Sequence, residues 1–587
     1  PMCMILIQWC YFALIAFVTG FTALFLFERR FGYRVKSAVS VLMAGLLTLN
    51  VYAQYFSLFS GVGLRANALL CAFVLMAAVV LRKRIKNFLK QKMEETGRGR
   101  LLLYGFLVLL FAYGSSRGYM HYDTGLYHAQ SIRWIEEYGV VPGLANLHSR
   151  FGYNSAAFAL CALFGGAGLT KYPMHCVQGF FALLCAVKCT ALLDLTRRKR
   201  VLVSDFLSAG CVFYLVAVFR ELVSPASDYF AMLILFFVVI TWAQLLERRE
   251  FSAVPYALLS LYLVYGATVK LSAAGMLVLA LYPGILLIRQ RKWGQIACYI
   301  GLGVFIALPW LARNAMISGW LFYPFTFPDL FDVDWKISKG YADSDAAEIQ
   351  VYAKEIFDVY QKDMPFSGWF PNWLQAQTVL DRVLVGCAWL AVPVSVLHLM
   401  AVAGKRVGAR LSGAAGKKGR KGAPGMTLVG ENGSCWAFAL LEAAALLGFL
   451  IWQFGAPLVR YGYFFVLFLP LVAFGGLYAR FFGREGGFRI FAGLLVAFLL
   501  YRGYNLGNMV LELWREPWYV YQQDYGTWPA ETYQVDGVTI YVPLDRGQIG
   551  YDKFPSSPVV QPIELRDGKT IESGFRQRAA GNHAGEE

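Results

Sequence analysis

Hydrophobic residues follow one another along most of this chain in blocks of roughly 17–25 residues, separated by shorter polar segments. A helix needs about 20 apolar residues to cross the hydrocarbon core of a bilayer, so each block predicts a transmembrane helix. The blocks cover residues 4–27, 38–59, 62–81, 101–118, 173–194, 203–220, 229–246, 254–269, 272–288, 294–311, 383–402, 435–453, 462–479 and 488–503. The pattern therefore predicts an all-α polytopic membrane protein with about fourteen transmembrane helices.

The composition agrees with this prediction, because 58% of the residues are hydrophobic and only 16% are charged. In soluble domains a smaller share of the residues is apolar, and about a quarter of the residues are charged. The composition also excludes a disordered chain, a coiled coil, a collagen and a secreted disulfide scaffold. The first block is too long for the apolar part of a signal peptide, so we expect it to remain as a transmembrane helix.

Basic residues are distributed unevenly along the chain, whose formal net charge is +17. Dense clusters follow every odd-numbered block and begin at Arg29, Arg82, Arg197, Arg248, Arg289, Lys405 and Arg480. Because Lys and Arg are enriched in cytoplasmic loops, the odd loops are predicted to be cytoplasmic and both termini to lie outside. The positive charge thus indicates membrane topology, and we expect no nucleic-acid partner.

Three long segments fall on the outer side of this topology, at residues 119–172, 312–382 and 504–587. We expect residues 1–503 to form the transmembrane domain and 504–587 a small extracytoplasmic module. Within that module an Asp-Gly pair at Asp536 precedes a β-type run, which predicts a hairpin. The Gly/Lys/Arg-rich segment 404–434 is predicted to be a flexible cytoplasmic linker, and the last residues, from about 577, to be disordered.

The first outer loop contains a candidate catalytic acid, Asp123, followed by a predicted helix over 124–138 in the headgroup plane. Tyr127 follows Asp123 by four residues, so both would face the same cavity. One interpretation is that Asp123 only caps this helix. The other is that it acts as a general base or binds a cation.

Residues 141–155 of the same loop are polar and turn-forming. They form either a capped loop leading into a short helix or a surface that binds substrate hydroxyls. In the second case the contacts would come from Asn146, His148, Arg150 and Asn154.

Further charged residues stand at the outer ends of predicted helices. Asp228 either caps the seventh helix or faces Asp123 across an outer cavity. Lys270 lies between two closely spaced blocks, where it either snorkels to the headgroups or binds a phosphate. Arg313 with Asn314, and Arg460, are either interfacial anchors beside aromatic residues or phosphate ligands, since arginine grips phosphate with two parallel hydrogen bonds.

Several of these motifs resemble those of a known superfamily. The acidic motif with its following helix, together with the pattern Pro-Trp-x-x-Arg-Asn-x-x-x-Ser-Gly-x-x-x-Tyr-Pro at residues 309–324, resembles the GT-C integral membrane glycosyltransferases. More narrowly, residues 122–128, 146–155 and 540–555 resemble motifs of a bacterial group of large multipass proteins.

The resemblance implies a GT-C-like fold and a place in the bacterial cytoplasmic (inner) membrane, with the active site facing outside. It implies transfer, with inversion, of a sugar from a polyprenyl-phosphate-linked donor to a saccharide, lipid or protein acceptor of the cell envelope. Asp123 would be the base, with Tyr127 and His128 lining the side of the acceptor. Lys270, Arg313 and Arg460 would hold the lipid phosphate. Some members of the superfamily need a divalent metal such as Mg or Mn, for which Asp123 and Asp228 are the candidate ligands.

Other functions remain open at this stage. A transporter or flippase of lipid-linked saccharides would carry ionisable residues near the centres of its helices and broken helices in repeated positions. A polysaccharide polymerase or ligase would depend on Arg and His of the outer loops rather than on Asp123. A scaffold of an envelope complex would catalyse nothing.

Overall fold

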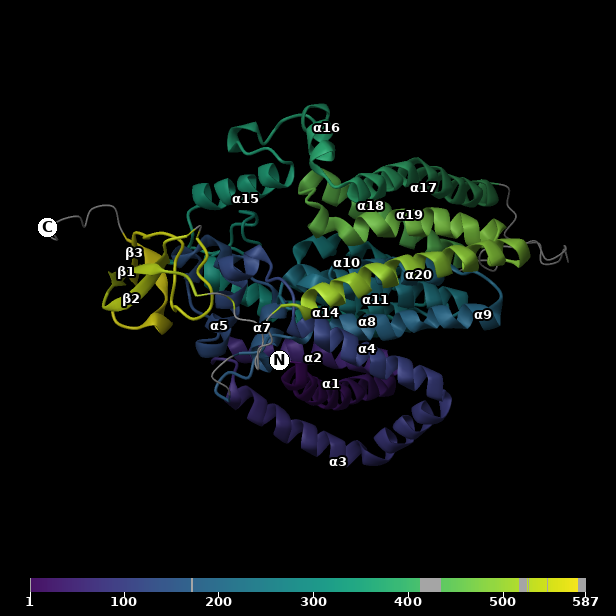
Figure 1. The fold of residues 1–587 in the computed structure, drawn as a ribbon, viewed down its shortest axis with the longest axis horizontal. Coiled ribbons are helices and arrows are strands. Elements are labelled where there is room, and N and C mark those ends of the chain that lie inside the picture. The colour runs from purple at the N-terminus through teal and green to yellow at the C-terminus, as the bar shows by residue number, and fades with distance from the viewer. Residues whose placement is uncertain are drawn as a thin grey trace.

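The computed structural model describes residues 2–169, 173–411, 434–516, 525, 527–545 and 547–578. It is a bundle of long helices with a small β-containing module at one end (Figure 1). The helices of the first half are α1 (Met2–Phe31), α2 (Ala38–Ser57), α3 (Leu64–Glu95), α4 (Arg98–Ser116), α5 (Ala129–Glu137), α6 (Leu144–Leu147), α7 (Ala156–Phe164), α8 (Val177–Cys189), α9 (Leu195–Arg198) and α10 (Val203–Ala217). Those of the second half are α11 (Ser227–Glu247), α12 (Ala253–Val269), α13 (Leu281–Arg289), α14 (Trp293–Ser318), α15 (Lys339–Ala353), α16 (Phe366–Ala376), α17 (Val379–Leu411), α18 (Ser434–Gly455), α19 (Val459–Phe481) and α20 (Glu485–Trp514).

Within the described residues, twelve helical segments are long and apolar enough to cross a membrane. The predicted all-α multipass fold is therefore confirmed, and every predicted block coincides with a helical segment. Two blocks correspond to helices that are apolar but shorter, α10 and α12. At about 1.5 Å per residue, helices of this length fall short of a hydrocarbon core about 30 Å thick. Of these two helices, α12 ends directly before Lys270.

The helices differ in how far the rest of the bundle covers them. The most apolar stretch of α11 is 89% buried, whereas that of α20 is only 11% buried. α11 therefore forms the centre of the bundle and α20 lies on its periphery. α1 and α2 approach closely, because a Cβ atom on Gly45 would lie 1.8 Å from the carbonyl oxygen of Ala16. Small residues at such a crossing allow membrane helices to pack backbone to backbone.

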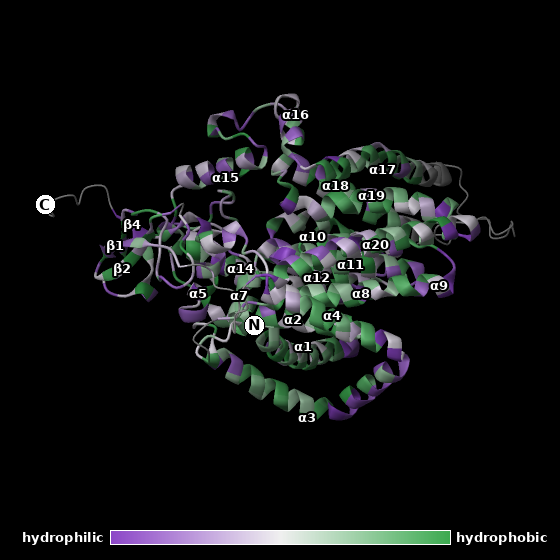
Figure 2. Ribbon diagram, in the orientation of Figure 1, coloured by the Kyte–Doolittle hydropathy of each residue, from purple (hydrophilic) through white to green (hydrophobic). Residues whose placement is uncertain are grey.

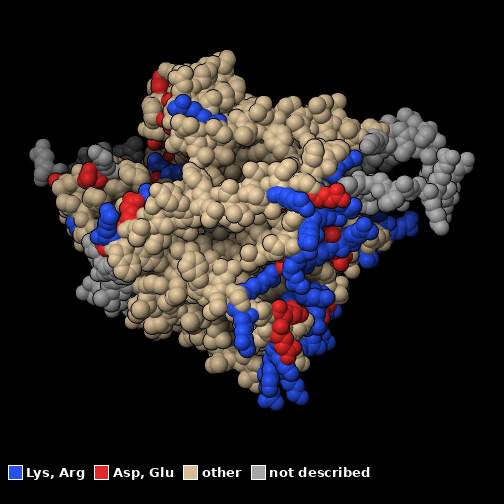
Figure 3. Space-filling model, turned by 45° about the vertical axis from the view of Figure 1, so that its right-hand side comes forward, with Lys and Arg blue, Asp and Glu red and all other residues tan. Residues whose placement is uncertain are grey.

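Polar residues gather at the two ends of the bundle, and hydrophobic residues extend along the helices between them (Figure 2). Most Lys and Arg side chains lie at one end, where α9 and the turn between α3 and α4 are found (Figures 1 and 3). The β module and α15 lie towards the opposite end. Within the described residues, basic clusters that follow odd-numbered blocks thus lie together at one end of the bundle.

The loop after α4 forms a compact layer of short helices: a π-helical turn η1 (Thr124–His128), α5, α6, a 3-10 turn η2 (Ser149–Gly152) and α7. The predicted helix over 124–138 is present as η1 followed by α5. It does not have an open face for lipid headgroups, because the C-terminal segment covers it. Gln130 donates to the carbonyl of Lys553 at 2.6 Å, and Trp134 packs against Phe554 with ring centroids 4.5 Å apart.

The C-terminal segment forms two small antiparallel sheets, β1 (Ala530–Val535) with β2 (Val538–Pro543), and β3 (Ile563–Leu565) with β4 (Phe575–Gln577). The predicted hairpin is confirmed. Asp536 and Gly537 both have positive φ, as a tight two-residue turn between twisted strands requires. The sheets share a hydrophobic cluster with α5, α6 and η2.

One glycine of the first loop makes this docking possible. Gly143 has a φ of +64°, and a Cβ atom there would lie 1.9 Å from the carbonyl oxygen of Phe575. Any larger residue would push the tail away from the loop.

Two segments differ from, or lie partly outside, the predicted boundaries. α20 continues to Trp514, so the helical region extends beyond residue 503. Most of the predicted linker 404–434 lies outside the described residues, although its first part continues α17 to Leu411. The residues from 579 onwards, at which disorder is predicted, also lie outside the described residues.

Candidate functional site

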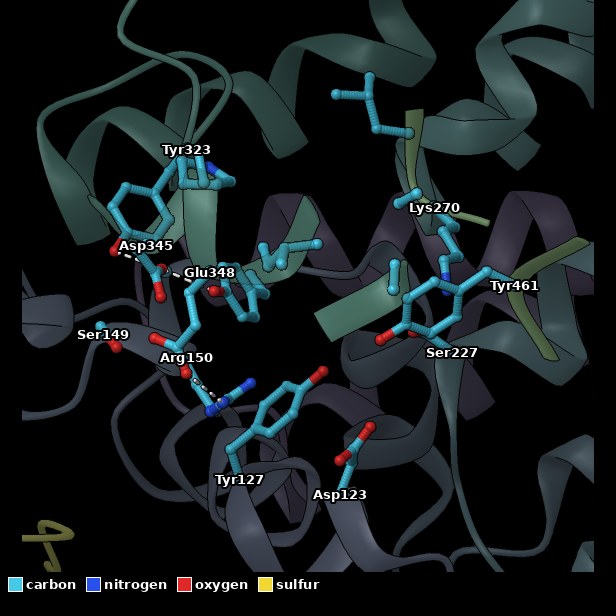
Figure 4. Close-up of a pocket in the computed structure, with 18 of the residues that line it drawn as sticks. Asp123, Tyr127, Ser149, Arg150, Ser227, Lys270, Tyr323, Asp345, Glu348 and Tyr461 are labelled. Atoms are coloured by element: carbon cyan, nitrogen blue, oxygen red, sulfur yellow. Dashed lines mark hydrogen bonds and ion pairs between the residues drawn. The ribbon is translucent and has the colours of Figure 1, made fainter. Parts of the chain in front are cut away.

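A cavity of about 1280 Å³ lies where the first-loop layer meets the ends of several long helices (Figure 4). Its lining comes from the loop after α4, from α11, α12, α14, α15, α18 and α19, and from the tail. In Figure 4, Lys270 and Tyr461 lie on one side of the cavity, and Tyr323, Asp345 and Glu348 on the other. Segments far apart in the sequence therefore build a single enclosure with two different walls.

The first wall, which we call the charged wall, consists of Asp123, Asp228, Lys270 and Arg460. Asp123 directly precedes η1 and its side chain makes no capping bond to that turn. Its carboxylate instead accepts a hydrogen bond from Nη2 of Arg460 at 2.5 Å. The interpretation of Asp123 as a helix cap is therefore wrong. π-Helical turns are rare and are frequently found at functional sites, so the position of Asp123 beside one is notable.

His121 stands next to this ion pair. Arg460 Nη1 lies 2.6 Å from His121 Nε2. Burial, and then the positive charge of Arg460, lower the pKa of His121. The imidazole is consequently neutral at physiological pH and accepts from the guanidinium.

Asp228 and Lys270 form the second ion pair of the charged wall. Asp228 lies in the first turn of α11, and its carboxylate accepts a hydrogen bond from the Lys270 ammonium. The Lys270 ammonium also lies 3.6 Å from the centre of the Tyr461 ring, within the range of a cation–π interaction. Arg460 donates to the hydroxyl of the same tyrosine at 3.2 Å. Tyr461 thus connects the two ion pairs.

The charged wall is balanced, with two carboxylates and two cations. Each cation has its own carboxylate partner. A phosphate that entered the cavity would compete with Asp123 for Arg460 and with Asp228 for Lys270. Binding of such an anion would leave the carboxylates free to accept a proton or a substrate hydroxyl.

Two further residues of η1 line the cavity, Tyr127 and His128. His128 packs edge to face on Tyr127 with centroids 4.3 Å apart, and its Nδ1 lies 3.3 Å from the Thr124 hydroxyl. Burial lowers the pKa of His128 to about 3 and raises the pKa of Tyr127 well above its ordinary value. Both side chains are therefore neutral hydrogen-bonding groups and not charged ones.

The second wall, which we call the tyrosine wall, consists of Arg150, Tyr153, Tyr323, Asp345 and Glu348. Tyr153 and Tyr323 donate to the same carboxylate oxygen, Oδ2 of Asp345, at 2.6 and 2.8 Å. Arg150 and Glu348 are 3.9 Å apart, longer than a hydrogen bond. His148 also lines the cavity near Arg150, and burial followed by that positive charge lowers its pKa to about 3.

Asn154 and Asn314 lie where the first loop meets α14. Asn154 donates to the side-chain oxygen of Asn314 at 2.8 Å, and Asn314 donates to the carbonyl of Leu321 at 2.7 Å. Both line the cavity. Their amides are engaged with the protein, so they shape the cavity by holding the loop to the helix.

Arg313 was expected at the phosphate site but does not line the cavity. It is buried, and it donates to the Ser57 hydroxyl at 2.8 Å, to the Gly139 carbonyl at 3.2 Å and to Asn154 at 3.3 Å. Its guanidinium therefore joins α2, the end of α5 and the first loop.

Asn146 also lies away from the cavity. Its amide donates to the carbonyls of Gly143, Trp335 and Phe575 at 3.2, 2.8 and 3.3 Å. It therefore fastens the tail to the first loop, and its expected contact with substrate hydroxyls is not available in this arrangement.

The two candidate metal ligands, Asp123 and Asp228, already have protein partners in this structure. Throughout the described part of the chain, no group of three or more His, Cys, Asp and Glu side chains is placed to hold a metal ion. The two expected ligands, Asp123 and Asp228, are each paired with a cation. The use of a divalent metal stays a prediction.

The tyrosine wall was largely missed by sequence reasoning. Arg150 was singled out from its polar segment, but Tyr323 entered only through the motif at 309–324, and Asp345 and Glu348 were not considered. Asp345 and Glu348 lie three residues apart on α15, a spacing that places both on one face of a helix. A search for a helix within the polar segment 312–382 could have identified this pair.

Comparisons with known proteins give a family but no relative of established activity. No curated protein and no solved structure matches the chain. A family model described as a domain of unknown function (DUF8201) matches residues 2–467, which include all four residues of the charged wall and all five of the tyrosine wall. The match covers most of the chain, and the protein therefore belongs to this family.

Proposed function

We propose that the protein is an inverting membrane glycosyltransferase of the GT-C type. In this proposal it moves a sugar from a polyprenyl-phosphate-linked donor to an acceptor of the cell envelope. The observation that carries the proposal is the charged wall, in which two carboxylates and two cations surround Tyr461 at the edge of a cavity of about 1280 Å³. Such a wall combines groups for a phosphate leaving group with a base for an acceptor hydroxyl.

The cations would bind the donor phosphate. Arg460 offers a planar guanidinium for two parallel hydrogen bonds, and Lys270 offers a point charge on the other side of Tyr461. The negative charge on the phosphate grows as the bond to the sugar breaks, so fixed cations stabilise the transition state more than the ground state. Asp228 would keep Lys270 in place before the donor arrives.

Asp123 would act as the general base. When the phosphate draws Arg460 away, the carboxylate of Asp123 is free to take the proton of the acceptor hydroxyl. The acceptor oxygen then attacks the anomeric carbon from the face opposite the phosphate. The bond between that carbon and the phosphate oxygen breaks, and the phosphate leaves with the electron pair.

The proposed orientation places the cavity at the outer face of the cytoplasmic membrane. The Lys- and Arg-rich end of the bundle would then be cytoplasmic, in agreement with the positive-inside rule. The β module and α9 lie at opposite ends of the bundle in Figure 1. The lipid-linked donor would reach the charged wall from the outer leaflet.

The first test is transfer by purified protein in nanodiscs supplied with polyprenyl-phosphate-linked glucose, galactose, mannose or arabinose and an extract of envelope glycans. We expect Asp123→Asn to lower the transfer rate about 10²–10⁴-fold, the usual effect of a general base. Asp194→Asn is a matched control, because Asp194 pairs with Arg100 away from the cavity at 2.5 Å. It should transfer at the wild-type rate.

Thermal unfolding is measured on the same samples. Loss of transfer by Asp123→Asn at an unchanged unfolding temperature supports the role of Asp123. Transfer at the wild-type rate by this variant would contradict it. Absence of donor consumption by the wild-type protein with all four donors would contradict the proposed reaction.

Transport of a lipid-linked saccharide is a second candidate, favoured by an ion pair inside two candidate spans. His398 on α17 contacts Glu442 on α18, and Glu442 is buried. Ionisable groups inside membrane helices frequently mark transport pathways. Movement of a fluorescent polyprenyl-phosphate sugar across proteoliposomes, lost in Glu442→Gln, would favour transport over transfer.

A further inference from the structure

The tyrosine wall has hydrogen-bonding capacity that the protein itself leaves unused. Asp345 is buried, and both phenols bind only its Oδ2. Within the described ranges, its other oxygen, Oδ1, accepts no hydrogen bond from the protein. Asp345 lines the cavity, so this oxygen is available to a ligand there.

Arg150 is similarly available. Its guanidinium approaches Glu348 only to 3.9 Å, and within the described part of the chain no hydrogen bond uses its donors. The side chains of Arg150 and Glu348 are 33% and 42% exposed, and both line the cavity. The wall therefore presents free donors and free acceptors a few ångströms apart.

The aromatic rings of this wall form a continuous row. Tyr127 packs edge to face on Tyr153 at 6.0 Å, and Tyr153 lies 5.8 Å from Tyr323 with the ring planes tilted by 33°. Burial, and then the charge of Asp345, raise the pKa of Tyr153 and of Tyr323 well above the ordinary value. The phenols hence stay protonated and hold the carboxylate in place, and both tyrosines line the cavity.

The charge of the wall selects against an anion. One guanidinium stands against two carboxylates, whereas the charged wall across the cavity has equal numbers of each sign. A phosphate beside Asp345 and Glu348 would be repelled. A neutral ligand with many hydroxyl groups can donate to carboxylates, accept from Arg150 and place its C–H faces on the tyrosine rings.

We propose that the tyrosine wall binds the neutral saccharide part of the acceptor, with Asp345 and Glu348 accepting from sugar hydroxyls and Arg150 donating to a sugar oxygen. The inference rests on the proposed function, because it divides the cavity into a phosphate side at the charged wall and a sugar side at the tyrosine wall. The acceptor class is then a hydroxyl-rich glycan and not a peptide or an anionic lipid.

Saturation-transfer NMR tests this inference on the full chain in nanodiscs. The probes are neutral trisaccharides of glucose, galactose, mannose and N-acetylglucosamine. We expect at least one of them to bind the wild-type protein, and Asp345→Asn to weaken that binding at least tenfold. Asp343→Asn is the matched control, because Asp343 lies on the same helix, bonds Thr326 at 2.8 Å and does not line the cavity.

A second variant guards against misfolding. Glu348→Gln changes a partly exposed side chain that no hydrogen bond holds in the described structure, and it should also weaken trisaccharide binding without lowering the unfolding temperature. Absence of trisaccharide binding by the wild-type protein would overturn the inference. Wild-type affinity in both Asp345→Asn and Glu348→Gln would overturn it too.

Farnesyl phosphate, a short lipid phosphate, separates this inference from the proposed function. Its binding should depend on Arg460 and should be unchanged in Asp345→Asn. Binding of farnesyl phosphate without any trisaccharide would overturn the sugar side alone. Trisaccharide binding without farnesyl phosphate binding would overturn the phosphate side and with it the proposed reaction.

Discussion

The two walls of the cavity hold their charges in different ways. On the charged wall, each carboxylate is matched with a cation, Asp123 with Arg460 and Asp228 with Lys270. On the tyrosine wall, Asp345 is held by two neutral phenols. A paired carboxylate changes its partner when a competing anion arrives, whereas a phenol-bound carboxylate keeps its charge for a ligand. Under the proposed function, the charged wall would exchange its partners on binding, and the tyrosine wall would keep its carboxylate ready for a ligand.

After the loss of transfer expected for Asp123→Asn, the largest effect is a loss of stability on breaking an ion pair of the charged wall. Lys270→Met leaves Asp228 without its partner in a site where the two side chains are only 20% and 12% exposed. An unpaired buried charge costs about 3 kcal/mol of unfolding free energy. The double variant Lys270→Met/Asp228→Asn should regain most of that loss in a denaturant titration.

Lys292→Met is the control for this measurement, because Lys292 is exposed in the turn before α14. A loss below about 1 kcal/mol for Lys270→Met would place the pair among ordinary surface ion pairs. The charged wall would then not be the tightly paired structure that the comparison assumes.

The pH dependence of stability probes a histidine beside each wall. His128 and His148 both have a pKa of about 3 in the folded protein because of burial. The unfolded chain, with a histidine pKa of about 6.5, binds more protons than the folded one between these values. Stability should therefore be constant above about pH 6.5 and fall by about 1.4 kcal/mol per pH unit for each histidine as the pH is lowered.

Unfolding temperatures between pH 8 and pH 4 check this expectation. His148→Asn should remove one of the two contributions and leave that of His128. An identical pH slope in this variant and in the wild type would show that His148 is not buried as a neutral group.

A smaller effect is expected on the tyrosine wall. Tyr323→Phe removes one of the two donors to Asp345 and leaves Tyr153 in place. We expect a loss of about 1.5 kcal/mol in unfolding free energy, typical of one hydrogen bond to a charged group. Tyr341→Phe is the control and should lose almost nothing, because Tyr341 is an exposed residue of α15 whose phenol makes no hydrogen bond in the described part of the chain.

The smallest effect is expected from metal removal. Because both carboxylates of the charged wall are paired with cations, EDTA should leave the transfer rate in nanodiscs unchanged. A large loss of rate, restored by Mg²⁺ or Mn²⁺, would show that the ion pairs open to coordinate a metal during turnover.

Much of the fold could be predicted from the sequence, because a membrane helix must be apolar over its whole length. The hairpin at Asp536 was predictable for the local reason that its turn needs positive φ. The packing of the C-terminal segment on α5 was not predictable. It depends on contacts such as that between Gln130 and Lys553, which are more than 400 residues apart in the chain. The closeness of Gly143 to Phe575 is of the same kind.

The charged wall could be predicted for a related reason, since Lys270 and Arg460 stand out in apolar surroundings. The same signal singled out Arg313, which instead bonds Ser57 and Gly139. Sequence shows that such a charge needs partners but does not show whether these are protein groups or a ligand. Asp345 gave only a weak signal, its helical spacing from Glu348, because the sequence does not show that the fold brings two tyrosines to this acid.

The tail residues that line the cavity are the last part of its lining to be synthesised. Gly547, Pro558, Val559 and Gln561 line the cavity and follow every candidate membrane span in the chain. A ribosome therefore completes all the helices before these residues exist. A nascent chain can insert its charged residues into the membrane while the enclosure around them is still open. Maturation of the enclosure is thus a late step of biogenesis, reached only after translation has passed the last helix.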